Sequence, residues 1–263
     1  SDVYKRQAYD LTPIPIFSDN YVWTLSNPDT GRAVVVDPGD AEPVTRFLEE
    51  NGLELEAILI THKHWDHISG IKSLKKRYGT TVYGPARETI DNVDITVSEG
   101  QTIDAPGVGM SFRVLDLQGH TAGHIGYLSD GLLFCGDTLF SAGCGRLFDG
   151  TAEQLHTSLE KIAGLPDATL ICCTHEYTLN NLHFALEVEP GNADIAAYIP
   201  EVENMMRQRR PSLPTSLEKE RRINPFLRTT FATVRSAVSA RSGRPMENDL
   251  DCFTALRKWK DEF

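Results

Sequence analysis

The most informative segment of this sequence is Thr61-His62-Lys63-His64-Trp65-Asp66-His67, which places three histidines and one aspartate within six residues. The apolar run Leu55–Ile60 precedes it and is typical of a buried strand. Ser69–Tyr78 follows it with the spacing of an amphipathic helix, and Gly79 ends that helix. The cluster therefore lies on a loop between a strand and a helix.

The spacing of the histidines indicates a metal site rather than a solvated loop. On a helix, His62 and His64 would point about 200° apart, whereas on an extended or turning loop both imidazoles can face one cation. Asp66 and His67 come at the start of the following helix and can reach a second cation. Neutral imidazole and carboxylate are suitable ligands for zinc, iron or manganese.

Three more candidate ligands follow strand-like runs further along the chain. They are His120 after Ser111–Leu117, Asp137 after Leu132–Cys135, and His175 after Thr169–Cys173. In layered α/β folds, ligands gather on loops at the ends of strands. We therefore expect these side chains to meet the first cluster at one edge of a sheet.

Seven ligands in this pattern predict two metal ions with one shared carboxylate. We assign His62, His64 and His120 to the first metal. We assign Asp66, His67 and His175 to the second, with Asp137 bridging the two. His124 competes with His120 in the same motif, but we interpret it, like Asp37, as a residue that supports the ligands from behind.

The chain changes in composition near His175. Short strand-like runs alternate with helical segments before it, which predicts a layered α/β fold. Five helices are predicted after it, at Leu179–Glu187, Ile195–Arg210, Leu213–Ile223, Phe231–Val238 and Leu250–Lys260. Residues 1–175 carry 13 Lys/Arg against 24 Asp/Glu, whereas residues 176–263 carry 13 of each, ten of the cations being arginine. We predict two domains, 1–175 and 176–263.

Composition excludes several classes of protein. The 263 residues are 40% hydrophobic, which is too apolar for a disordered chain, and no apolar run approaches the length of a membrane span. The net charge of −11 argues against a nucleic-acid partner. Five cysteines without a disulfide framework, and no signal peptide, predict a cytoplasmic protein. We expect a monomer, and we assign no element to Ser1–Gln7.

The motifs resemble those of a known superfamily. Thr-His-x-His-x-Asp-His at 61–67, Gly-His-Thr-x-Gly-His at 119–124, Gly136-Asp137 and Thr174-His175 are similar to the metallo-β-lactamase superfamily. The longer run Gly136–Thr151, together with Asn224–Arg228 and the ending Arg257–Phe263, closely resembles the glyoxalase II (hydroxyacylglutathione hydrolase) family. This likeness extends from about Ile14 to Phe263.

The resemblance implies an αββα sandwich followed by a small all-α domain. It implies a binuclear thioester hydrolase that converts S-D-lactoylglutathione to glutathione and D-lactate, the second step of methylglyoxal detoxification. A hydroxide bridging two divalent metals would attack the thioester. Zinc is favoured, and iron or manganese also suit the ligands. Asp66 would orient that hydroxide and Asp137 would bridge the metals. Glutathione contacts are implied at Arg146, Phe148, Tyr177, Arg257 and Lys260.

Three positions depart from the family pattern, one of them Trp65, which replaces a commonly polar residue between the ligands, and two other activities stay open. Gln118 stands where many members have proline, and Phe148 where some have tyrosine, so one hydrogen bond to glutathione is missing. A glutathione persulfide dioxygenase of the same superfamily would keep a single iron on two histidines and one aspartate. A lactonase or β-lactamase would use the same ligands on other esters or amides.

Overall fold

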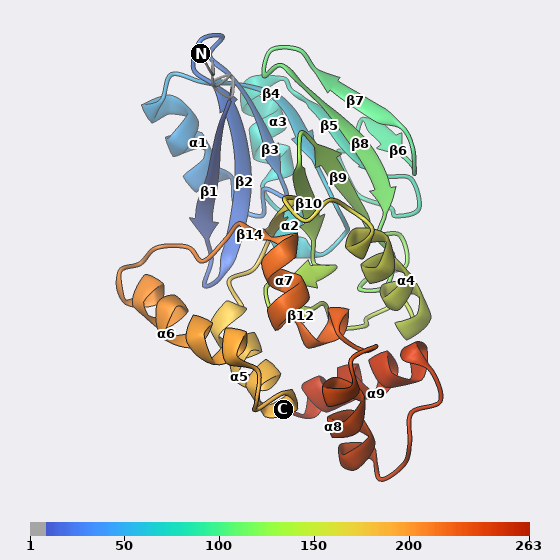
Figure 1. The fold of residues 1–263 in the computed structure, drawn as a ribbon. Coiled ribbons are helices and arrows are strands. Elements are labelled where there is room, and N and C mark those ends of the chain that lie inside the picture. Colours follow the sequence, from blue (N-terminus) through green and yellow to red (C-terminus); the bar gives the residue numbers. More distant parts are fainter. Residues whose placement is uncertain (1–8) are drawn as a thin grey trace, which may run out of the picture.

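Two β-sheets packed face to face form the upper part of the molecule in Figure 1. This computed structural model describes residues 9–263, so Ser1–Gln7 lies outside the described residues. The strands of the first sheet, in spatial order, are β1 (Asp10–Ile16), β2 (Asn20–Asn27), β3 (Arg32–Val36), β4 (Glu54–Leu59), β5 (Thr81–Pro85) and β6 (Ile95–Val97). From β3 to β6 the neighbouring strands run parallel.

The second sheet carries the later strands. In spatial order they are β14 (Thr215–Ser216), β13 (Leu170–Cys173), β10 (Leu132–Gly136), β9 (Ile125–Ser129), β8 (Met110–Asp116) and β7 (Thr102–Ala105). A separate two-stranded hairpin joins β11 (Leu139–Phe140) to β12 (Gly143–Cys144). The hairpin follows β10 directly, so it begins two residues after the predicted bridging ligand Asp137.

Helices cover the outer face of each sheet. Those on the first sheet are α1 (Ala41–Glu50) and α3 (Ile71–Tyr78), and α4 (Ala152–Ala163) lies on the second. Strand β3 illustrates how both faces of the first sheet are buried. Its successive side chains point alternately into two different cores. Val34 and Val36 belong to the core between the sheets, whereas Val35 packs in the core under α1 and α3. The α/β prediction and the sandwich are therefore confirmed.

The C-terminal helices gather below the sandwich in Figure 1. They are α5 (Thr178–Val188), α6 (Ala193–Arg207), α7 (Leu217–Ile223), the 3₁₀ turn η1 (Pro225–Leu227), α8 (Ala232–Ser242) and α9 (Asp249–Glu262). They share the large core with the sheets, since Phe253 and Leu256 of α9 belong to the same buried cluster as Leu155 of α4. The helical part is thus packed firmly on the rest of the molecule.

Two of the predicted helices begin two or more residues later than expected. The helix predicted for Leu213–Ile223 begins only at Leu217, because Thr215 and Ser216 pair with β13 as the short strand β14 and Ser216 caps the helix by accepting from the Lys219 amide. The helix predicted from Ser69 begins at Ile71. Gly70 interrupts it, since its amide donates to the carbonyl of Pro38 and a Cβ there would lie 2.5 Å from that oxygen.

Other features of the fold concern the cysteines and the membrane. The five cysteines are buried and unpaired within residues 9–263, which agrees with the expectation of no disulfide framework. No helix in the described part of the chain combines the length and apolarity needed to cross a membrane.

Candidate metal centre

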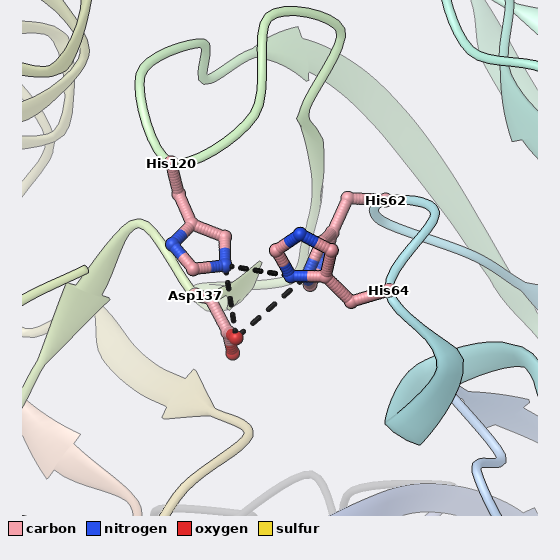
Figure 2. Close-up of side chains that lie close together, drawn as sticks. All are labelled: His62, His64, His120 and Asp137. Carbon is pink, nitrogen blue, oxygen red and sulfur yellow. Dashed lines mark hydrogen bonds and ion pairs between the residues drawn. The ribbon is translucent and has the colours of Figure 1, made fainter. Parts of the chain in front are cut away.

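Four predicted ligands meet around one point (Figure 2). Nδ1 of His64 lies 3.2 Å from Nε2 of His62 and 3.0 Å from Nε2 of His120. Oδ2 of Asp137 lies 3.4 Å from Nε2 of His120 and 3.7 Å from Nε2 of His62. Ligands about 2.0–2.1 Å from a tetrahedral metal stand about 3.3–3.4 Å from each other, so the four atoms are spaced as such a site requires.

A second group of donor atoms lies on the other side of Asp137. Oδ2 of Asp66 is 3.3 Å from Nε2 of His67 and 3.4 Å from Nε2 of His175. Oδ2 of Asp137 is 3.3 Å from each of the same two nitrogens. One carboxylate oxygen is therefore shared by both groups, as a bridging ligand would be.

Two buried atoms at the centre show that the residues fit metal ions. Nε2 of His67 and Oδ1 of Asp137 have no hydrogen-bond partner within the described chain. Leaving such atoms unpaired in a protein interior costs free energy. A cation between these donors would satisfy Nε2 of His67, so the chemistry of the set suits two divalent metals.

The loop geometry follows from the strands that precede it. His62 and His64 extend from the end of β4, and the short helix α2 (Trp65–Ile68) then turns Asp66 and His67 toward the same point. Asp137 follows β10 through Gly136, whose φ is +52°. A Cβ at Gly136 would lie 2.4 Å from the Thr61 hydroxyl, so only glycine allows the two loops to approach.

Residues behind the ligands fix their orientation. The buried Asp37 carboxylate accepts from the Thr61 amide at 2.8 Å, and its Oδ2 lies 2.9 Å from Nδ1 of His67. His124 accepts from the Asp137 amide at 3.1 Å through Nε2. Both side chains therefore support ligands from behind, as outer partners of metal sites do.

Three supporting contacts were not predicted from the sequence. Nδ1 of His175 lies 2.8 Å from Oδ1 of Asp19, and Nδ2 of Asn20 donates to Oδ2 of Asp66 at 2.9 Å. The carbonyl of Arg146 lies 2.7 Å from Nδ1 of His120. Asp19 directly precedes β2 and Asn20 begins it, both more than 40 residues before Asp66, and no local signal in the sequence links them to a metal site.

The histidine ligands differ in the direction in which their pKa is shifted. Burial lowers the pKa of His62 and of His120, so both stay neutral and able to bind a cation. Burial also lowers the pKa of His175, but the adjacent Asp137 outweighs it and the pKa rises to about 12. The same carboxylate raises the pKa of His67 against its burial. A metal ion held by the second group would therefore have to displace protons from these histidines.

A cavity of about 410 Å³ opens onto the centre. Its walls include Asp66 and Asp137 at one side and the five predicted glutathione contacts, which are Arg146, Phe148, Tyr177, Arg257 and Lys260. The structure thus brings five of the seven predicted metal ligands and the predicted substrate contacts to one cavity, although those substrate residues span more than 100 positions along the chain.

The cationic residues of this cavity differ in what they can offer a ligand. The Arg146 side chain is 68% exposed. Burial and the nearby charges of Arg257 and Arg146 lower the pKa of Lys260, which indicates a local excess of positive charge. Arg257 is buried and donates to the Cys144 carbonyl at 2.8 Å and to Asp261 at 2.8 Å. Most of its guanidinium is therefore occupied within the protein.

Aromatic rings complete the cavity. The Phe148 ring lies edge-on to His64 and His120, with centroids 4.8 and 5.0 Å away, and is 64% exposed. The Tyr177 ring stacks on His175 with centroids 4.7 Å apart. These rings form apolar walls on either side of the metal ligands.

Comparisons with known proteins cover both parts of the chain. The family model described as the metallo-beta-lactamase superfamily matches residues 19–175, and the one described as the hydroxyacylglutathione hydrolase C-terminus matches residues 176–263. Among solved structures, ETHE1 from Myxococcus xanthus is 25% identical with a TM-score of 0.65, covering 95% of this chain and 90% of that one. A B3 metallo-beta-lactamase, BLEG-1, is 24% identical with a TM-score of 0.63, covering 83% of this chain and 99% of the other, and shows the fold alone.

Curated relatives are more similar. The hydroxyacylglutathione hydrolase of Albidiferax ferrireducens is 49% identical over 96% of this chain and 99% of its own length. That of Pseudomonas fluorescens is 47% identical over 96% of this chain and 99% of its own length. With two groups of metal-binding donors joined by Asp137 and relatives matched from end to end, the chain belongs to the hydroxyacylglutathione hydrolase family of the metallo-β-lactamase superfamily.

Proposed function

We propose that this protein hydrolyses the thioester bond of S-D-lactoylglutathione and related 2-hydroxyacylglutathiones, releasing glutathione and D-lactate. The observation that carries the proposal is the carboxylate oxygen of Asp137, which lies 3.3 to 3.7 Å from histidine nitrogens of both donor groups. Two divalent metals held there would lower the pKa of a water to about 7 and would polarise a carbonyl oxygen. The end-to-end relatedness to hydroxyacylglutathione hydrolases supports the same reaction.

The residues have separable roles in this proposal. His62, His64 and His120 hold the first metal, and the second metal is held by Asp66, His67 and His175. Asp137 joins them, and Asp66 also faces the cavity, where its carboxylate can orient the attacking water. Burial raises the pKa of Asp66, but His175 and His67 outweigh it and hold the pKa well below the usual range. Asp66 therefore stays ionised at neutral pH and can accept a hydrogen bond.

The cationic side of the cavity supports a glutathione thioester over a smaller ester. Arg146 and Lys260 present positive charge toward the same cavity as the metal ligands, and a glutathione carries two carboxylates at the far ends of its peptide. We assign the peptide carboxylates to these two cations and the peptide backbone to the walls formed by Phe148 and Tyr177. Arg257 acts mainly by holding the cavity wall, because its donors are already engaged.

One comparison of substrates separates this function from its rivals. Purified, metal-loaded protein is given S-D-lactoylglutathione, glutathione persulfide with an oxygen electrode, a lactone and a β-lactam. We expect thioester hydrolysis and no oxygen uptake, because the two donor groups can hold two metals, whereas a persulfide dioxygenase needs one iron. Oxygen uptake without thioester hydrolysis would overturn the proposal.

Four finer properties belong to the same proposal. Zinc is the metal that we favour, since His-rich tetrahedral sets suit it, with iron and manganese as alternatives to be resolved by metal analysis of the isolated protein. We propose a cytoplasmic monomer, to be tested by cell fractionation and by light scattering. We also propose a domain boundary near residue 175, supported by the change in composition and to be tested by limited proteolysis.

A further inference from the structure

The β11–β12 hairpin next to Asp137 is held by side chains rather than by its own ladder. Only two residue pairs join its strands, Leu139 with Cys144 and Phe140 with Gly143. At its turn, Ala142 has a φ of +58°, the left-handed region that a residue with a Cβ enters only at a cost in free energy. A hairpin this short needs support from elsewhere in the protein.

Glu220 of α7 supplies the central part of this support. Its Oε1 accepts from the Ser141 hydroxyl at 2.8 Å, and its Oε2 accepts from the Ala142 amide at 2.9 Å. The Glu220 side chain is fully buried, as is Ala142. No cation makes an ion pair with this carboxylate among the described residues, so the donors of the turn are what stabilise it.

Buried side chains from the same helical part hold the remaining carbonyls of the hairpin. Nδ2 of Asn224 donates to the carbonyls of Phe140 and Gly143 at 3.1 and 3.0 Å. Nδ2 of Asn181 donates to the Ser141 carbonyl at 3.1 Å. Nδ2 of Asn224 also donates to Oε2 of Glu220 at 3.4 Å. Glu220 in α7 and Asn224 just after it therefore form one hydrogen-bond network around the turn.

The hairpin carries part of the cavity wall. Phe140 and Cys144 line the cavity, and Arg146 follows two residues later with its exposed guanidinium. The Gly145 amide donates to the Thr138 carbonyl at 3.1 Å, which ties the end of the hairpin to the residue after Asp137. Movement of the turn would therefore displace the wall on which the glutathione part of a substrate lies.

We propose that Glu220 is a positioning residue for glutathione binding, which fixes the Ser141–Ala142 turn and through it the cavity wall formed by Phe140, Cys144 and Arg146. The inference rests on the proposed function for the identity of the ligand. Glu220 lies outside the cavity and touches no metal ligand, so its effect reaches the substrate only through the hairpin.

The test compares two substitutions of Glu220 at full metal loading. Glu220→Ala removes both acceptors, and we expect the Kd for glutathione, measured by calorimetry, to rise about tenfold, with a similar rise in KM for the thioester. Glu220→Gln keeps one oxygen for the Ala142 amide, while the Ser141 hydroxyl can turn to accept from the new amide. We expect this conservative variant to restore binding to within about threefold of the parent protein.

Glu189→Ala is the matched control. Glu189 is also a buried carboxylate of the helical part, but its partners are Arg228 and Thr233, and it makes no hydrogen bond to the hairpin. We expect this variant to lose thermal stability without a change in Kd for glutathione. Equal rises in Kd for Glu220→Ala and Glu189→Ala would overturn the proposal, because a general loss of stability would then explain both.

A second variant keeps the proposal testable if Glu220→Ala does not fold. Ser141→Ala removes the hydroxyl that Glu220 holds and leaves the carboxylate in place, and we expect a rise of about threefold in Kd for glutathione. Unchanged binding in that variant would contradict the proposal. Binding of glutathione needs no turnover. An inactive parent protein would therefore count against the thioesterase function, while the Kd values of the Glu220 variants would still show whether Glu220 positions the glutathione site.

Discussion

Oδ2 of Asp137 and Nε2 of His175 lie 3.3 Å apart, although His175 follows the strand β13 and Asp137 follows its neighbour β10. The parallel pairing of these two strands places both residues at the same edge of the sheet. The same oxygen of Asp137 is within 3.7 Å of His62 on the opposite side. The position of one carboxylate between two donor groups therefore follows from strand order.

Substitution of this carboxylate tests the shared site. In Asp137→Ala we expect kcat/KM for the thioester to fall at least about 100-fold, because loss of outer partners alone costs 10- to 100-fold in metal sites. Metal analysis should show fewer than two ions per chain. Asp104→Ala removes an exposed carboxylate on β7 and should leave both quantities unchanged. Full activity in Asp137→Ala would exclude the bridging role.

Asp37 should affect metal retention without touching the metals. Its Oδ2 accepts from the Thr61 hydroxyl at 2.6 Å and lies 2.9 Å from Nδ1 of His67, so an amide in its place would lose one acceptor. In Asp37→Asn we expect metal affinity to weaken about 10- to 100-fold at one of the two sites. Competition with a chelator measures this, and two ions held as tightly as in the parent protein would show that Asp37 does not support His67.

Phe148→Tyr should strengthen binding of the substrate. The Phe148 ring lines the cavity and is largely exposed, so an added hydroxyl would meet solvent or a ligand rather than the core. A new hydrogen bond contributes about 0.5–1.5 kcal/mol, which corresponds to a fall in KM of about 2- to 10-fold. Steady-state kinetics with the thioester checks this, and a rise in KM would place the peptide of the substrate elsewhere.

The stability of the protein should depend on pH through Glu220. Burial raises its pKa from 4.5 to about 7, against the donors of Ala142 and Ser141. The folded state therefore binds this proton more tightly than the unfolded state does. The contribution of Glu220 to the free energy of unfolding is greatest at low pH and falls by about 3 kcal/mol as pH rises from 4.5 to 7.

Glu220→Gln isolates that contribution, because glutamine does not titrate. The free energy of unfolding of both proteins is measured by urea titration at constant metal loading at pH 5, 6, 7 and 8. We expect the difference between the parent protein and the variant to fall as pH rises. The charge of the neighbouring Lys219 lowers the pKa of Glu220, against the effect of burial. A difference that stays constant with pH would contradict the raised pKa.

The metal-ligand cluster was predictable because its signal is local. His62, His64, Asp66 and His67 lie within six residues, and His120, Asp137 and His175 each follow a recognisable strand. The edge strands β7 and β14 were not predicted, since the apolar alternation of Thr102–Ala105 covers only four residues and Thr215–Ser216 is too short to show one. Short elements of this kind are defined by the strands that they pair with, not by their own residues.

Supporting contacts were harder to predict for a physical reason. Asp19 reaches His175 across 156 positions, and Glu220 reaches Ser141 across 79, so these pairs depend on the tertiary fold. The glutathione contacts expected at Arg257 and Lys260 show the same limit. Their spacing places both on one face of α9, but the sequence did not show that Cys144 and Asp261 would occupy the Arg257 guanidinium.

The proposed metal-dependent thioesterase activity is best measured as hydrolysis of S-D-lactoylglutathione before chelation, after chelation and after return of metal. If the protein is the proposed thioesterase, we expect rapid hydrolysis that a chelator abolishes and that two equivalents of a divalent metal restore, because the two donor groups joined by Asp137 would hold the metals that activate water. A folded protein that carries two metals per chain and still leaves the thioester intact would contradict it.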